Sequence, residues 1–484
     1  MKMTLPEGYR LYERSVHESE GTGFALVRDP DGEKLLCVQG EAPAGLEDAK
    51  NVGESLFFPL TPANAGILCQ IFPWLCPRTI NPEMPSFGFG DRLGVATPGH
   101  VRSTRNRDIF PVFVQQSIRE MDRTRMTPQE VMDAAMWGVF QEGYTTGFGA
   151  DADHLKTLAD LEGVIAAGYT FYTCDPSDYV NDRAATLPSS ELRREFEHLD
   201  EHERLRAEYL NNRFELRDTK GGEDLHFEFT EPELQRTAVK YFRAVQHAIS
   251  MYRELTGRLG EFDYEVSVDE TESPTTPKEH FFIANELDRA NVRFIGLALR
   301  FVGEFQKGID YIGDLAEFEN QIKAHASIIR VLGPYRISVH SGSDKFGVYP
   351  LIRKHFGNLL HVKTAGTSYL EALHLLALDE PRLFRAIYRF AQSRYDEDKR
   401  TYHVTQDPRI PDIETVSDEG LAELFKQNDA RQVLHVTYGS VLNWRDDDGT
   451  ELFRPQLMDA LKNHEEHYRE LITQHFKRHL DPLE

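Results

Sequence analysis

A repeating alternation of short apolar runs and helical stretches is the feature that most restricts the fold of this chain. Eight apolar runs, each ending in polar or charged residues, occur at 92–100, 144–154, 169–178, 264–272, 293–301, 336–344, 359–366 and 432–440. Nearly continuous apolar runs are typical of strands in a parallel sheet that helices cover on both faces. Eight such units close a (β/α)8 barrel, whereas a doubly wound open sheet, the alternative, more usually has about five or six strands. We therefore predict an α/β fold built on a TIM-type barrel.

The stretches between these runs carry helix signals. The segment 127–143 opens with a capping box, in which Thr127 precedes Pro128 and Glu130 follows at the third helical position. The segment 314–333 ends on a glycine, as many helices do. The stretch 179–262, between the third and fourth predicted strands, is too long for one crossover helix. We predict that it is a helical insertion.

The first 85 residues form a unit of their own in this interpretation. The segment 24–39 consists of two strand-like runs around Asp-Pro-Asp-Gly, which is a hairpin signal. We predict a small α/β cap at 1–85 and a barrel domain at 86–484.

Composition limits the partners. The formal net charge of −24 argues against nucleic acid or an anionic membrane as a partner, since either would favour a basic face. The four cysteines lack zinc-ribbon spacing, and neither a signal-peptide core nor an apolar run of roughly 20 residues is present. We expect a cytoplasmic protein that acts on a small molecule. The sequence leaves the oligomeric state open, a homo-oligomer included.

The ends of the predicted strands collect chemically reactive side chains. In a barrel of this kind the carboxyl ends of the strands carry the active site. Random strand ends would rarely supply so many histidines and carboxylates, which favours a functional site. The residues are His100, Asp153, His154, Asp175, Asp178, Asp269, Glu270, Arg300, Glu304, His340, His361, Lys363 and His435.

Two of these ends suggest acid–base chemistry. Asp153 and His154 lie where a strand passes into a helix, although an N-cap role for Asp153 explains its position equally well. Asp269 and Glu270 follow a strand and precede Ser-Pro-Thr-Thr-Pro, which restricts the loop. A carboxyl group held rigidly at a strand end suits a general acid or base.

Three histidines suggest a metal site. His154, His340 and His361 lie on separate predicted strands, whose ends meet at a barrel mouth, and imidazole is a common ligand of divalent metals. A single histidine is more often an ordinary buried polar residue. By the period of two, His361 and Lys363 share one face of their strand.

Cations also gather near the strand ends, which in so acidic a chain suggests a site for a carboxylate or phosphate; ion pairs with the nearby acids are the alternative. They are Arg92, Lys156, Arg300, Lys307, Lys345 and Lys363.

Six segments in order resemble the tagaturonate epimerase family of bacterial hexuronate catabolism. They are GFGDRLGVATPGH (88–100), GFGADADHLKT (147–157), SVDETESPTTPKEHFF (267–282), RFVGEFQKGIDYIGD (300–314), ISVHSGSDKFGVYP (337–350) and HVKTAGTSYLEAL (361–373). The resemblance covers nearly the whole chain from about residue 85 and is weaker before it.

This resemblance implies interconversion of D-tagaturonate and D-fructuronate with a divalent metal cation. Carried over by position, Asp153 corresponds to the proton acceptor, Glu270 to the proton donor and His154 to a metal ligand. His340 and His361 correspond to further ligands, and Glu304 is another candidate. We expect Arg92, Arg300, Lys345 and Lys363 to bind substrate. The alternatives are a ketose isomerase or aldolase acting on a related sugar acid, and a sugar-acid-binding protein without catalysis.

Overall fold

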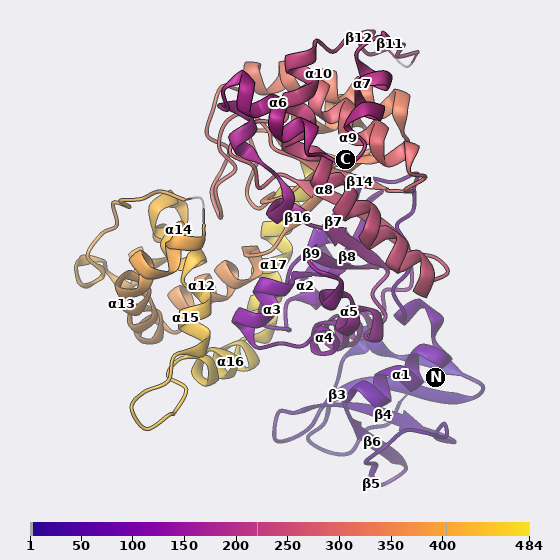
Figure 1. Ribbon diagram of the computed structural model, residues 1–484. Helices are drawn as coiled ribbons and strands as arrows, with labels where there is room; N and C mark the ends of the chain where they lie inside the picture. The colour runs from indigo at the N-terminus through magenta and orange to yellow at the C-terminus, as the bar shows by residue number, and fades with distance from the viewer. Residues whose placement is uncertain (1–2, 220, 403) are drawn as a thin grey trace.

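The computed structural model describes residues 3–219, 221–402 and 404–484 (Figure 1). Its centre is a closed barrel in which every pair of neighbouring strands is parallel, so the predicted TIM-type barrel is confirmed. The strands are β7 (Ser86–Phe89), β8 (Phe110–Ser117), β9 (Gly149–Leu155), β10 (Phe171–Cys174), β13 (Asp263–Val268), β14 (Gly296–Leu299), β15 (Arg336–Val339) and β16 (Leu360–Thr364).

Helices fill the connections between barrel strands. The predicted capping box is present in α4 (Pro128–Glu142), where Thr127 and Glu130 cap each other's backbone N–H groups and Gly143 ends the helix with a positive φ of 57°. Helix α10 (Leu315–Leu332) begins after Asp314, whose carboxylate accepts hydrogen bonds from the first turn. The remaining barrel helices are α2 (Thr97–Thr104), α3 (Ile118–Thr124), α5 (Leu161–Ala166), α9 (Pro277–Arg289) and α11 (Tyr349–Phe356).

Two of the eight predicted strands are wrong. The segment 92–100 is a loop followed by the start of α2, and the segment 432–440 is helical, mostly within α14 (Asn428–Val436). The barrel is completed instead by β7 and β8. Strand β7 has only four residues, one of them glycine, so its apolar character is too brief to stand out from the adjacent loop. Two predicted segments are not strands and two barrel strands were not predicted, so the predicted number of strands still equals the number in the barrel.

The predicted insertion is present, but its place in the strand count changes. It lies between β10 and β13, the fourth and fifth barrel strands, because the barrel begins at β7. Its longest element is an amphipathic helix that packs on α9. The insertion contains α6 (Ser189–Glu197), α7 (His202–Tyr209), a hairpin of β11 (Phe214–Leu216) and β12 (Leu225–Phe227), and α8 (Glu231–Arg258).

An antiparallel sheet precedes the barrel. Strands β3 and β4 pair as the predicted hairpin, with Gly32 at positive φ in the turn. Figure 1 shows this sheet at one end of the molecule, beside α4. Its strands are β1 (Arg10–Leu11), β2 (His17–Ser19), β3 (Thr22–Arg28), β4 (Lys34–Gln39), β5 (Lys50–Val52) and β6 (Ser55–Pro59), followed by α1 (Pro62–Ile71).

Helices follow the last barrel strand and form a lobe beside the barrel (Figure 1). Helix α17 leaves this lobe and packs closely on α2, where a Cβ at Gly99 would lie 2.5 Å from Ile472 Cγ2. The helices are α12 (Thr367–Asp379), α13 (Pro381–Asp398), α14, α15 (Tyr438–Asn443), α16 (Arg454–Asn463) and α17 (Glu465–Leu480). Within the described ranges, every helix is too short or too polar to cross a membrane.

Candidate active site

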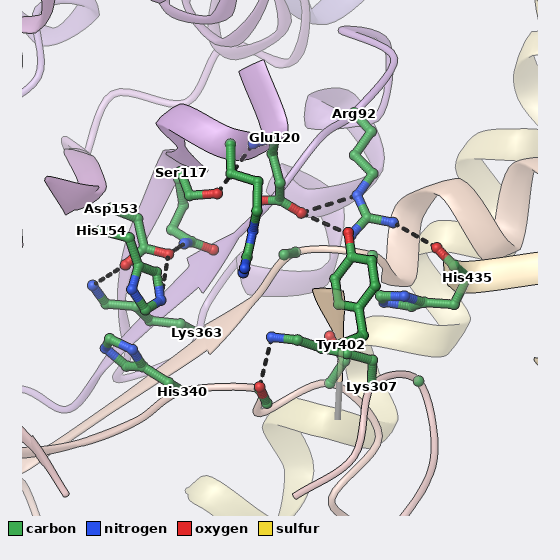
Figure 2. Close-up of a pocket in the computed structure, with 17 residues that line it drawn as sticks. Arg92, Ser117, Glu120, Asp153, His154, Lys307, His340, Lys363, Tyr402 and His435 are labelled. Carbon is green, nitrogen blue, oxygen red and sulfur yellow. Dashed lines mark hydrogen bonds and ion pairs between the residues drawn. The ribbon is translucent and has the colours of Figure 1, made fainter. Parts of the chain in front are cut away.

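Two adjoining cavities lie at the carboxyl ends of the barrel strands. The inner pocket, of about 40 Å³, is lined by Asp153, His154, His340 and Lys363 among others (Figure 2). The outer pocket, of about 500 Å³, is lined by Asp269, Glu270, Arg300 and neighbouring residues. Both cavities share Arg119, Lys307, Ser341 and Tyr402, so they adjoin at these residues, and we refer to the two together as the cleft.

Asp153, His154 and His340 converge in the inner pocket. Each offers one ligand atom, and these atoms lie within 4.8 Å of one another. Asp153 and His154 belong to β9, whose register against β10 shifts here, and His154 has a positive φ of 54°. This local departure from regular strand geometry turns two consecutive side chains toward the same cavity, where an ideal strand would point them to opposite faces.

A carboxylate behind each histidine fixes the ring. Asp175 Oδ2 lies 3.1 Å from His154 Nδ1, and Glu265 Oε1 lies 2.8 Å from His340 Nε2. His154 Nε2 and His340 Nδ1 are the remaining ring nitrogens, and they lie 3.8 Å from Asp153 Oδ2 and 3.4 Å from Asp269 Oδ1 respectively. Carboxylate-backed histidines are the usual arrangement of metal ligands.

The donor set therefore fits a divalent cation. Two imidazole nitrogens and one or two carboxylate oxygens suit several transition metals. Burial would lower the pKa of both histidines, but the surrounding carboxylates raise the pKa of His154 to about 9 and that of His340 to about 10. The cluster thus favours positive charge, which two protons or one divalent cation would supply.

Lys363 lies at the bottom of the inner pocket among three carboxylates. Its Nζ is 2.7 Å from Asp151 Oδ2, 2.9 Å from Asp153 Oδ1 and 2.9 Å from Glu265 Oε1. It also donates to Thr173 Oγ1 at 2.6 Å. These partners occupy the ammonium group, so Lys363 holds Asp153 in place and leaves Oδ2 of that carboxylate toward His154.

Three other residues that were expected in the site line the cleft farther from His154 and His340. Glu270 and Arg300 line the outer pocket, where the Glu270 side chain is 38% exposed and therefore accessible to a ligand. Arg92 lines the inner pocket, but its Nε and Nη2 both donate to Glu120 Oε1 and its guanidinium stacks on Tyr438 at 3.6 Å.

The last three expected residues lie elsewhere. His361 is below Lys363 in the barrel, with Nδ1 2.8 Å from Ser86 Oγ, and burial lowers its pKa to about 3. Lys345 donates to three backbone carbonyls, and burial lowers its pKa to about 7. Glu304 forms a backbone bridge with Ile312, and its carboxylate is 3.9 Å from Arg300. Neither His361 nor Lys345 lines the inner or the outer pocket.

Several residues of the site were missed in the sequence. Asp151 precedes Asp153 by two positions, and Glu265 is a carboxylate within an apolar run. Both positions could have been recognised in the sequence as buried carboxylates near the site, and the structure buries both. Arg119 and Glu120 follow β8, a strand that the sequence pattern did not reveal. They could not be placed at the barrel mouth without it.

Comparisons with known proteins agree with this architecture. The sequence model of the UxaE tagaturonate epimerase family matches residues 12–483. A tagaturonate/fructuronate epimerase of Thermotoga maritima is 45% identical over 483 residues, which cover 99% of this chain and 97% of that protein.

Solved structures are also similar. The native crystal structure of the fructuronate-tagaturonate epimerase UxaE from Cohnella laeviribosi superposes with a TM-score of 0.94 and 39% identity over 99% of this chain and 97% of that chain. A glycerol complex of the same enzyme gives a TM-score of 0.93 and 39% identity over 98% and 96%. Family match, sequence identity and superposition extend over nearly the full chain, and the chain belongs to the tagaturonate epimerase family of carbohydrate epimerases.

Proposed function

We propose that this protein interconverts D-tagaturonate and D-fructuronate with the help of a divalent cation held by His154 and His340. The observation that carries the metal proposal is the pair of carboxylate-backed histidines that point their remaining nitrogens toward Asp153 and Asp269. A bound cation would act as a Lewis acid that stabilises negative charge on substrate oxygens.

The two ketouronates differ at a carbinol one position beyond the carbon next to the ketone. Removal of the C–H proton at that carbinol gives no enolate, so simple deprotonation beside a carbonyl cannot invert it. A retro-aldol route can. A base removes the hydroxyl proton, the adjacent carbon–carbon bond breaks, and its electron pair moves to the ketone-bearing fragment. The carbinol carbon becomes an aldehyde, which turns and is attacked on its other face.

Asp153 and Glu270 are the proposed acid–base pair. Asp153 is ionised, because His154, Lys363 and His340 hold its pKa below the usual range despite burial. It can therefore accept the hydroxyl proton in the inner pocket. Glu270 lies in the outer pocket within the same cleft and can return a proton to the new alkoxide. The same group pair serves both directions of the reaction.

Proton NMR of D-tagaturonate incubated with the protein tests the function. We expect D-fructuronate signals to appear, to stop growing after EDTA and to resume after a divalent cation is added back. Accumulation of two three-carbon products would identify an aldolase instead. Unchanged substrate in the presence of every divalent cation tried, together with substrate binding, would identify a binding protein.

A further inference from the structure

Two cations stand at the junction of the inner and outer pockets. Arg119 belongs to α3, which starts directly after β8 and is capped by Ser117 Oγ. Lys307 belongs to the loop between β14 and α10, and Figure 2 shows its ammonium group directed at the pocket. Both residues line both cavities.

Neither charge is neutralised by a close carboxylate. Lys307 Nζ donates to Ser341 Oγ at 2.7 Å and forms no ion pair within the described ranges. Arg119 has one long ion pair among the described residues, with Nη2 3.6 Å from Glu270 Oε1. Burial and the nearby Arg119 lower the pKa of Lys307, which reflects the missing partner. Two cations without a close carboxylate partner, in the described part of a chain of net charge −24, favour an anionic ligand between them.

Other cations of the cleft are paired or lie in one pocket only. Arg92 is paired with Glu120, and Lys363 contacts three carboxylates. Arg300 is 3.9 Å from Glu304, a longer contact than that of Arg119 with Glu270, but Arg300 lines only the outer pocket. Arg119 and Lys307 are therefore the cations best placed to reach a ligand that extends from the inner pocket outward.

The loop that carries Lys307 is held firmly. Lys345 Nζ donates to the carbonyl of Gln306 at 2.8 Å. Arg431 Nε donates to the carbonyl of Gly308 at 2.8 Å. These contacts on both sides of Lys307 fix the position of its backbone, as is required of a preorganised binding site.

We infer that Arg119 and Lys307 bind the carboxylate of the ketouronate and retain the carboxylate-bearing fragment while its aldehyde turns. This inference rests on the proposed function. Inversion by bond cleavage requires that the aldehyde rotates without leaving, and an anchored carboxylate at the far end of the fragment permits that rotation. Ser341, which binds Lys307, directly follows His340, so the anion subsite adjoins the metal cluster.

D-glycerate and glycerol are suitable probes, because they share a three-carbon skeleton with the aldehyde fragment and differ in the carboxylate. Binding is measured by calorimetry with the purified protein before and after EDTA treatment, since D-glycerate also has groups that bind metals. We expect Arg119→Gln and Lys307→Met each to weaken D-glycerate binding about 10- to 100-fold in both forms. Glycerol binding should not change.

Arg123→Gln is the matched control. Arg123 is one turn further along α3 and lies over the same Tyr402 ring, at 4.8 Å against 5.5 Å for Arg119, but it lines neither pocket. We expect its D-glycerate affinity to equal that of the wild type. During turnover, Arg119→Gln should also release free aldehyde, which a trapping reductant would capture, and Arg123→Gln should not.

The outcomes separate the two proposals. Unchanged D-glycerate affinity in a folded Arg119→Gln variant would overturn the anion subsite, even if Lys307→Met fails to fold. Wild-type protein that binds D-glycerate through these cations but leaves D-tagaturonate unchanged would support the subsite and refute the proposed reaction. Epimerisation with full affinity in both variants would refute the subsite alone.

Discussion

His475 Nε2, on the C-terminal helix α17, lies 2.6 Å from Asp344 Oδ1 in the loop that follows His340. Asp344 Oδ2 accepts a hydrogen bond from Arg431 at 2.6 Å. The backbone N–H of Asp344 donates to His479 Nε2 at 2.9 Å. The ligand atoms of Asp344, His475 and His479 lie close enough together to hold a metal ion, but the hydrogen bonds described here already occupy these atoms. The cluster therefore joins the end of the chain to the loop that lines the inner pocket.

The first prediction is that Asp344→Asn destabilises the fold by about 3–5 kcal/mol, because it leaves Arg431 buried without its charged partner and removes one of the two carboxylates paired with His475. Urea unfolding followed by circular dichroism measures the change. Asp396→Asn is the control, since Asp396 is 90% exposed in its ion pair with Lys399 and its substitution should leave the unfolding midpoint nearly unchanged. Equal losses in the two variants would contradict the prediction.

The second prediction concerns pH. Burial alone would lower the pKa of His475, but Glu371 and Asp344 raise it to about 9, above the value of about 6.5 for the unfolded chain. Proton binding to His475 thus stabilises the folded state fully below about pH 6.5, and the effect disappears as pH rises through 9. The stability difference between wild type and His475→Gln should shrink by on the order of 2–3 kcal/mol from pH 6 to pH 9.5. A constant difference would show that His475 does not titrate in this range.

The fold was predictable where the chain alternates strongly. Six of the eight predicted runs coincide with barrel strands, because buried parallel strands need continuous apolar residues on both faces. The segment 432–440 is also rich in apolar residues, like the six runs that form strands, but it is helical, mostly within α14, and packs in the C-terminal lobe. A short buried helix and a short buried strand look alike when both faces are covered, and only tertiary contacts distinguish them.

The site was predictable only in part, for a related reason. Asp153 and His154 lie in a recognisable strand and His340 follows another, and the structure brings the three together. His361 and Lys363 do share one strand face, but the layer that each occupies depends on the barrel register, which a single sequence does not contain. Lys345 shows that a cation beside a strand end can serve backbone carbonyls instead of a ligand.

The third prediction is that His154→Ala and His340→Ala each lower bound metal and activity together. Each change removes one of the two carboxylate-backed nitrogens. Metal content is measured by plasma mass spectrometry after dialysis. The thermal midpoint should also fall, and the added metal should no longer raise it, because a cation bound only to the folded state stabilises that state.

His361→Ala is the comparison for these variants. His361 is a buried barrel histidine like His340, but it lies against Ser86 and Phe171 below the pocket. We expect it to retain bound metal. Loss of metal in His361→Ala as well as in His154→Ala and His340→Ala would favour the three-histidine ligand set implied by the resemblance over the set proposed from the structure.

The fourth prediction is that Asp153→Asn and Glu270→Gln each lower kcat by roughly 10²–10⁴ while substrate still binds, as expected for general acid–base groups. The amides preserve shape, so bound metal should change little in either variant. Asp153 also lies within ligand distance of the histidines. Loss of metal in Asp153→Asn would therefore identify Asp153 as a ligand, and unchanged kcat in both variants would remove the proposed acid–base pair.

The last prediction distinguishes bond cleavage from proton abstraction. In the retro-aldol route the C–H bond of the inverted carbinol never breaks, since the carbon passes through an aldehyde that keeps its hydrogen. Turnover in deuterated water should therefore leave that position unexchanged, which proton NMR of the product measures directly. The Arg119→Gln variant gives the same answer when its escaped aldehyde is reduced with an unlabelled hydride, because the resulting alcohol carbon should carry two protium atoms and no deuterium. Deuterium at the inverted carbon would refute the cleavage route and favour repeated enolisation.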